Sequence, residues 1–96
     1  MIEIRTTGIF DTWLSDLEDG IARRAIASRV QRLSFGLKGD VEPVGNGVSE
    51  LRIHLGPGYR VYFTQRGKVL IVILCGGSKK TQKKDIATAK RIAAEL

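Results

Sequence analysis

The period of the hydrophobic pattern changes twice along this chain, from two residues to about 3.6 residues and then back to two. Ile2 and Ile4 alternate with charged residues, which predicts a short strand. Residues 10–17 and 21–33 then carry apolar positions at helical spacing, with Gly20 between the two stretches, so an antiparallel pair of helices is predicted. Thr7 is placed to cap the first helix. Ile21 opens the apolar stripe of the second. The outward side of the second helix carries four arginines: Arg23, Arg24, Arg29 and Arg32.

The second half of the chain alternates with period two. Apolar residues at 51, 53 and 55 and at 59, 61 and 63 flank Gly56-Pro57-Gly58, which predicts a β-hairpin with a three-residue loop. Residues 68–75 are predicted to form a central strand covered on both faces, because positions 69–75 are an uninterrupted apolar run. The glycine-containing stretch 36–47 predicts a loop, and apolar spacing over residues 86–96 predicts a closing helix.

These elements predict one domain over residues 1–96, of the α+β class. We expect a curved antiparallel sheet of about four strands, with an N-terminal helical hairpin packed on one face and a C-terminal helix. A chain of 96 residues is expected to form a single core, because chains divide into several cores only well beyond this length.

Charge is distributed unevenly, within a formal net charge of +6. Residues 1–50 carry six basic and eight acidic side chains, whereas residues 51–96 carry ten basic and two acidic ones, a balance of +8. A surplus of this kind is expected on a surface that faces a polyanion. The apolar runs are far shorter than the roughly 20 residues of a membrane span, and Cys75 is the only cysteine. The composition therefore predicts a soluble cytoplasmic domain that uses no metal or other cofactor.

The hairpin register determines which side chains share a face of the sheet. If Leu55 pairs with Tyr59, six apolar side chains line one face, where helices can cover them. The same register predicts an exposed patch on the opposite face, made of Arg52, His54, Arg60 and Tyr62. Lys79 and Lys80, which follow the central strand, are expected at its edge.

A patch of this composition suits phosphate chemistry. The sequence has no paired carboxylates of the glycosidase kind, no nucleophile with a histidine partner and no phosphate-binding glycine motif. Arginine and lysine can hold phosphate, Tyr62 can stack on a base and His54 can transfer a proton. Composition and spacing alone thus predict a basic α+β domain that binds nucleic acid. A solvated strand face and an ordinary surface histidine are the simpler alternatives.

Three blocks of sequence carry a resemblance to a known family. They are Gly47-Val48-Ser49-Glu50-Leu51-Arg52-Ile53, Gly56-Pro57-Gly58-Tyr59-Arg60-Val61-Tyr62-Phe63, and Leu74-Cys75-Gly76-Gly77 followed by Lys79-Lys80-Thr81-Gln82. Together they resemble the RelE/ParE superfamily of toxins from type II toxin–antitoxin modules. The most similar branch is the HigB-like addiction module killer proteins, which are related to phage Gp49 proteins.

The resemblance implies a toxin that enters the ribosomal A site and cuts mRNA without a metal, by attack of a 2′-hydroxyl group. Arg60 matches the Tyr-Arg motif of the family, which implies that it clamps the phosphate and the transition state. Arg52 lies where relatives carry basic residues. The sequence departs from the family after Gly77, where several interferases have a catalytic tyrosine or histidine and this chain has neither.

The resulting candidates fall into two groups. The catalytic ones are Arg60, Arg52, His54, Lys79 and Lys80, and the RNA-binding ones are Tyr62, Lys83 and Lys84. The expected partners are mRNA on the ribosome, with its ribosomal RNA, and a cognate helix-turn-helix antitoxin in a hetero-oligomer; no membrane is involved. Two other functions stay open, a ParE-like inhibitor of DNA gyrase and a degenerate toxin that only binds its antitoxin.

Overall fold

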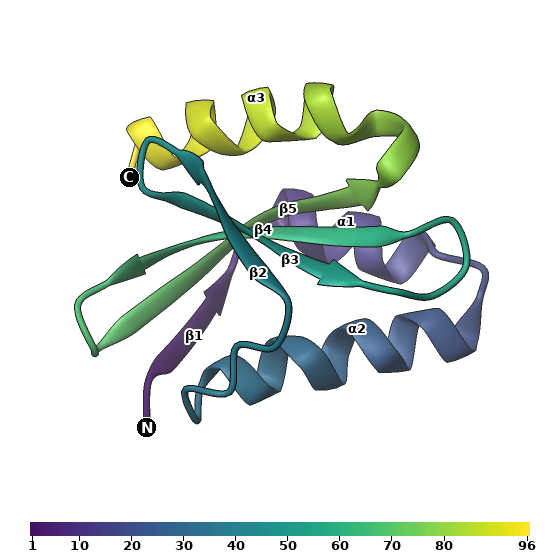
Figure 1. Ribbon diagram of the computed structural model, residues 1–96, viewed down its shortest axis with the longest axis horizontal. Coiled ribbons are helices and arrows are strands. Elements are labelled where there is room, and N and C mark those ends of the chain that lie inside the picture. The colour runs from purple at the N-terminus through teal and green to yellow at the C-terminus, as the bar shows by residue number, and fades with distance from the viewer.

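The computed structural model describes residues 1–96 as an α+β fold, as the sequence predicts (Figure 1). No helix in it is both long enough and apolar enough to cross a lipid bilayer. The elements follow in the order β1 (Glu3–Thr6), α1 (Gly8–Asp16), α2 (Gly20–Leu33), β2 (Val41–Gly45), β3 (Val48–Ile53), β4 (Tyr59–Arg66), β5 (Leu70–Ser78), the short 3-10 helix η1 (Lys79–Thr81) and α3 (Gln82–Ala94).

The sheet has five strands in the order β1-β5-β4-β3-β2, one more than the four expected. The additional strand is β2, which lies within the predicted loop and pairs with β3 at one edge of the sheet. Its alternation is broken by Pro43 and by a bulge before Gly45, and proline is tolerated mainly on edge strands. The sheet is also mixed rather than purely antiparallel, because β1 runs parallel to β5.

The predicted pairing of β3 with β4 is wrong by two residues. Tyr59 pairs with Ile53 rather than with Leu55, so the loop between the strands covers residues 54–58. Within this loop the N–H of Gly58 donates to the carbonyl of Leu55, and both Gly56 and Gly58 adopt positive φ angles. Because side chains alternate with period two, a shift of two residues leaves every side chain on its predicted face and changes only its cross-strand partner.

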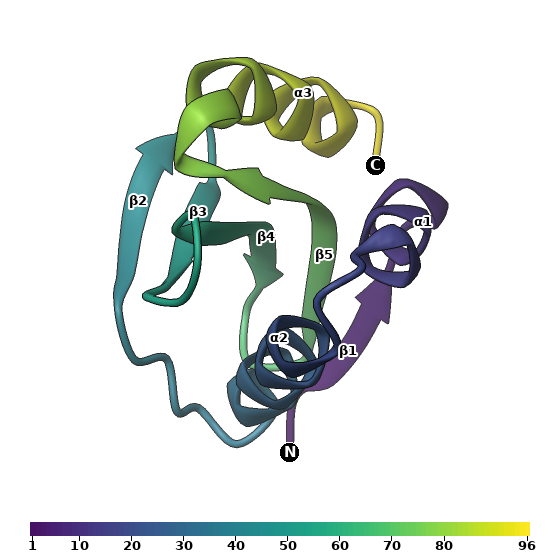
Figure 2. The same cartoon turned by 90° about the vertical axis from the view of Figure 1, so that its right-hand side faces the viewer.

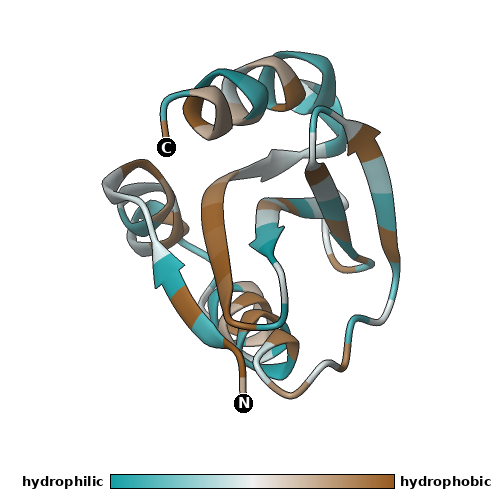
Figure 3. Cartoon of the chain, turned by 90° about the vertical axis from the view of Figure 1, so that its left-hand side faces the viewer, coloured by the Kyte–Doolittle hydropathy of each residue, from teal (hydrophilic) through white to brown (hydrophobic).

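Helices cover both faces of the sheet (Figure 2). On one face, α1 and α2 pack on the apolar side of the strands through Phe10, Ala22, Ile26, Val30, Leu33, Leu51, Ile53, Tyr59, Val61, Phe63, Ile71 and Ile73. On the other face, α3 packs on a smaller cluster formed by Val48, Tyr62, Leu74, Cys75 and Ala89. The strand β5 serves both layers, and its apolar run is evident in Figure 3. The helical hairpin on one face and the C-terminal helix are therefore as predicted.

A polar side chain caps the N-terminus of each of the first two helices. The Thr7 hydroxyl accepts the N–H of Phe10 and donates to the Leu74 carbonyl at 2.6 Å, so it caps α1 and ties it to β5. The Asp19 carboxylate caps α2. Ile21, predicted on the buried stripe, is exposed because it lies in the first turn of α2, beyond the edge of the core.

Candidate functional site

The α3-facing side of β3 and β4 brings the two arginines of the predicted patch together. Arg52 and Arg60 are direct cross-strand partners, and Glu50 lies opposite Tyr62 one step further along the same face. The helix α3 begins with Gln82 above this pair of strands. The site therefore consists of two guanidinium groups on a sheet surface, with a carboxylate behind them and a helix alongside.

Glu50 is the centre of this arrangement, although the sequence pattern predicts no role for it. Its side chain is 1% exposed. It accepts hydrogen bonds from Arg52 Nε at 3.0 Å, Tyr62 Oη at 3.0 Å and Gln82 Nε2 at 2.9 Å. Arg60 Nε lies 3.6 Å from the same carboxylate. A buried carboxylate with two cations and two neutral donors is fully compensated, which is the condition under which a charge is tolerated away from water.

These contacts determine the protonation state of Glu50. Burial alone raises the pKa of the carboxyl group, but the hydrogen bonds from Arg52, Gln82 and Tyr62 and the charge of Arg60 outweigh it. The net pKa therefore lies below the usual value of a glutamate, and Glu50 is ionised at neutral pH. Its negative charge holds the two arginines in place.

Arg60 is less accessible than an outward strand residue was expected to be. Its side chain is only 13% exposed, because α3 and the 54–58 loop lie next to it. One guanidinium nitrogen, Nη1, donates to the Gly58 carbonyl at 3.0 Å, while Nε is buried and makes no hydrogen bond. The same Gly58 carbonyl accepts the backbone N–H of Lys79 at 2.9 Å, so the structure brings Lys79 next to Arg60. Lys80 is exposed on η1.

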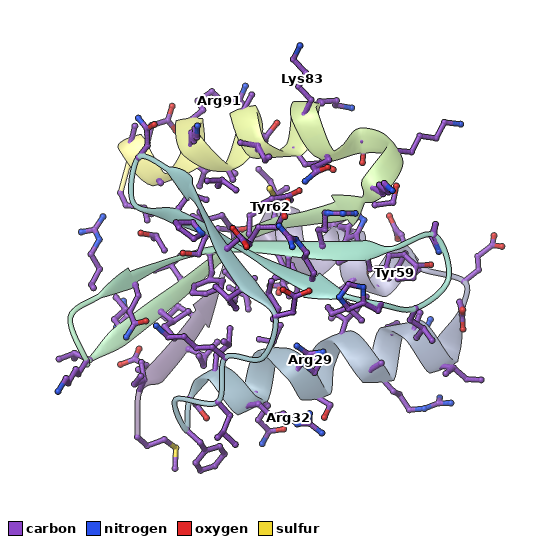
Figure 4. The ribbon with its side chains drawn as sticks, viewed as in Figure 1. Arg29, Arg32, Tyr59, Tyr62, Lys83 and Arg91 are labelled. Carbon is purple, nitrogen blue, oxygen red and sulfur yellow. The ribbon has the colours of Figure 1, made fainter.

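The expectation that Tyr62 is exposed for base stacking is wrong. The ring is fully buried beneath α3, and its hydroxyl donates to Glu50 (Figure 4). Burial, followed by the nearby Glu50 charge, raises the pKa of the phenol well above its ordinary value. The alternation of polar and apolar residues predicts helices on the apolar face of the sheet only, whereas α3 covers this part of the polar face as well. Tyr62 is therefore a structural residue, and neither face of its ring is accessible to a base.

His54 lies outside the strand, in the 54–58 loop, and 76% of its side chain is exposed. Its Nε2 hydrogen-bonds to Asp40 Oδ2 at 2.6 Å, and Arg52 Nη1 lies 3.7 Å from the other oxygen of that carboxylate. The hydrogen bond from His54 is the main reason why the pKa of Asp40 lies below its usual value. Asp40 therefore connects His54 to the arginine pair. Nothing in the sequence pattern marks Asp40, because it directly precedes β2, a strand that the pattern does not predict.

The remaining lysine candidates lie on α3. Lys83 points away from the sheet, as Figure 4 shows, and Lys84 is exposed beside a cleft between α1 and α3 that Trp13 and Tyr59 also line. Neither lysine forms an ion pair within the chain, so both are available to an external anion. They lie apart from the Glu50 contacts, at the periphery of the site.

Close contacts leave no room for a side chain at Gly76 and Gly77, near the end of β5. A Cβ atom at Gly76 would overlap the ring of Trp13, and one at Gly77 would overlap the Asp85 carboxylate. Gly77 lies opposite Arg60 in the sheet. The two glycines allow α1 and α3 to approach β5 from opposite faces beside the arginine site. No group of three or more His, Cys, Asp and Glu side chains gathers in a way that could hold a metal ion.

Comparison with known proteins gives two matches. Residues 12–95 match the family described as phage-derived protein Gp49-like. An uncharacterized protein of Haemophilus influenzae (strain Rd) is 50% identical over 95 residues, which cover 99% of this chain and 96% of that protein. The matched region includes every residue of the arginine site.

Proposed function

Because this chain belongs to the Gp49-like family of phage-derived proteins, a toxin-like family of addiction modules, we propose that it is the toxin of a type II toxin–antitoxin module and acts as a ribosome-dependent mRNA interferase. We further propose that it acts in the cytoplasm and that a helix-turn-helix antitoxin neutralises it in a hetero-oligomer. The observation that carries the enzymatic part is the Arg52–Arg60 pair held by the buried Glu50 carboxylate. The resemblance to RelE/ParE toxins supports the same conclusion.

The reaction needs no nucleophile from the protein. The 2′-oxygen of a ribonucleotide forms a bond to the adjacent phosphorus, and the bond from phosphorus to the next 5′-oxygen breaks. A base accepts the 2′-hydroxyl proton and an acid donates a proton to the leaving 5′-oxygen, so the products are a 2′,3′-cyclic phosphate and a 5′-hydroxyl group. Negative charge accumulates on the phosphate oxygens in the transition state, where positioned cations stabilise it.

Arg60 and Arg52 supply those cations. Arginine presents several donors in a planar fork and binds phosphate oxygens in pairs. Glu50 acts as a positioning residue, since it orients Arg52 through a hydrogen bond and faces the Arg60 guanidinium without touching the RNA. His54 and Lys79 are the candidates for proton transfer, whereas the buried Tyr62 with its raised pKa is not.

The test uses purified protein in a translation reaction, with cut sites in the mRNA located by primer extension. We expect new cuts with the wild-type protein and a loss of about 100-fold in cutting rate for Arg60→Ala, the loss typical of removing one transition-state donor, about 3 kcal/mol. Arg66→Ala is the matched control, because Arg66 is an exposed arginine at the far end of the same strand. It should cut at the wild-type rate.

Arg60→Lys keeps the positive charge, so it separates a chemical role from a folding defect. A folded Arg60→Lys variant, checked by circular dichroism, should still cut slowly because lysine lacks the fork geometry. Wild-type protein that makes no cuts would refute the interferase proposal. Accumulation of cleaved DNA–gyrase complexes with intact mRNA would then identify a gyrase inhibitor, and expression without growth arrest would identify a degenerate toxin.

A further inference from the structure

A second basic region lies on α2, away from the contacts of Glu50. Arg29 and Arg32 form a shared wall between two adjoining hollows, one closed by residues 36–39 and the other by residues 53–55. We call these two hollows together the α2 groove. Figure 4 shows both arginines on α2, next to the loop that leads into β2. The groove is therefore a structural feature formed by a helix and two loops, not by a single run of sequence.

The α2 groove is positively charged because basic side chains line it. Arg29, Arg32, Lys38 and His54 line it, and no carboxylate is among its lining residues. Neither Arg29 nor Arg32 nor Lys38 forms an ion pair or donates a side-chain hydrogen bond. The whole of α2 contains four arginines and no acidic residue. Unpaired guanidinium groups that converge on a hollow are the arrangement that binds phosphate.

The loop that closes the groove packs against Arg29. Gly39 has a φ angle of +67°, which L side chains rarely adopt, and a Cβ atom there would overlap the Arg29 guanidinium. A cation near a helix C-terminus also offsets the negative end of the helix dipole, and Arg32 in the last turn of α2 is sufficient for that purpose. Gly39 therefore suits the backbone angle of this loop and leaves room for the Arg29 guanidinium beside it.

The groove adjoins the Arg52–Arg60 site. His54, which lines the groove, hydrogen-bonds to Asp40, and the same carboxylate lies 3.7 Å from Arg52. The backbone N–H of Arg52 also donates to the Asp40 carbonyl at 2.9 Å, so the loop wall is fixed to β3. Basic side chains therefore follow one another from Arg60 through Arg52 and His54 to Arg29, with the Asp40 carboxylate beside them.

We propose that the α2 groove is a second phosphate-binding site, which holds the backbone of an RNA strand beside the phosphate at Arg52 and Arg60. The choice of RNA as the ligand rests on the proposed function, while the affinity for phosphates rests on the groove itself. Arg29 and Arg32 each contact one phosphate. The strand is either the substrate mRNA or a segment of ribosomal RNA, and both offer the same backbone chemistry.

The experiment measures binding of a fluorescent single-stranded oligoribonucleotide whose 2′-hydroxyls are methylated, so that it cannot be cut by this reaction. Each phosphate neutralised on a single strand contributes about 0.7 to the slope of log affinity against log salt. The double variant Arg29→Gln/Arg32→Gln should therefore bind more weakly than wild type, with a slope smaller by about 1.4. Arg23→Gln/Arg24→Gln is the matched control, since it removes the same charge from the same helix outside the groove.

A second arm measures cosedimentation of the same proteins with purified ribosomal subunits. A selective loss of oligonucleotide binding in the groove variant assigns the groove to the substrate strand, and a selective loss of subunit binding assigns it to ribosomal RNA. Equal losses for the groove and control pairs, or no loss in either arm, would overturn the proposal. Groove-dependent binding by a protein that never cuts mRNA would refute the interferase proposal and leave the groove assignment standing.

Discussion

Replacing Glu50 by glutamine tests whether the buried carboxylate holds the site together. Glutamine has nearly the same shape, but it removes the negative charge and turns one acceptor into a donor. Three donors from Arg52, Tyr62 and Gln82 then face an amide that can satisfy only some of them. The two arginines also lose the countercharge that lies against them.

The size of the effect follows from these contacts. Removing one partner of a buried ion pair costs about 3–5 kcal/mol, and we take the lower end because Arg52 is 32% exposed. A loss of about 3 kcal/mol in the free energy of unfolding lowers the melting temperature of a domain of this size by about 12 °C or more. Glu42→Gln is the control, since Glu42 pairs with Glu50 on the neighbouring strand but is exposed. Its effect should stay within about 0.5 kcal/mol.

The pH dependence of the free energy of unfolding is a second, independent test of the role of Glu50. The folded-state pKa of Glu50 lies below 4.5, the value for an unperturbed glutamate. The ionised group therefore contributes its full stability above about pH 4.5, and this contribution is lost as the pH falls through the folded-state pKa. Urea unfolding followed by circular dichroism, at pH 7 and through a series below pH 4.5, should show the wild type approaching the variant in acid. Equal stabilities at pH 7, or a gap that does not narrow in acid, would refute this account of Glu50.

Three further predictions concern the framework around the site. Gly77→Ala should destabilise the fold by about 1–3 kcal/mol, because the added methyl group overlaps the Asp85 carboxylate. Gly8→Ala is the control, since a methyl group there meets open space and should not destabilise the fold. Equal melting temperatures of the two variants in thermal melts would contradict the steric argument. Burial raises the pKa of the Cys75 thiol to about 12, so iodoacetamide should modify it at neutral pH only after unfolding, and rapid labelling of the native protein, read by mass spectrometry, would count against this. Thr7→Ala should cost about 1–2 kcal/mol in urea unfolding, since it removes a helix cap and a hydrogen bond to β5; an unchanged midpoint would show that the cap contributes nothing.

Period-two alternation was sufficient to assign side chains to faces of the sheet but not to pair them. Arg52 and Arg60 were placed on one face correctly even though the register was wrong, because a shift of two residues preserves the face. The loop length depends on the backbone angles of Gly56 and Gly58, which the sequence pattern does not specify. The strand β2 was missed because Pro43 interrupts its alternation.

The sequence pattern could not predict that part of the polar face of the sheet is buried. Alternation marks Glu50 and Tyr62 as outward residues, and it contains no information on whether a helix later in the chain covers them. The contact between Glu50 and Gln82 joins residues 32 positions apart. Hydrophobic spacing reports the face that an element buries, whereas this network depends on where α3 lies above the sheet. A lone acidic residue between apolar and basic positions of a strand was the one available signal.

The parallel pairing of β1 with β5 has a consequence for synthesis. Thr7, directly after β1, bonds to Leu74 on β5, which is 67 residues later in the chain. At 5–20 residues per second, the first strand waits about 3–13 s on the ribosome before its partner has been translated. Gln82, the α3 donor to Glu50, comes later still. The arginine site is therefore assembled only after all five strands and the start of α3 have been made, so a nascent chain shorter than 82 residues carries no finished site.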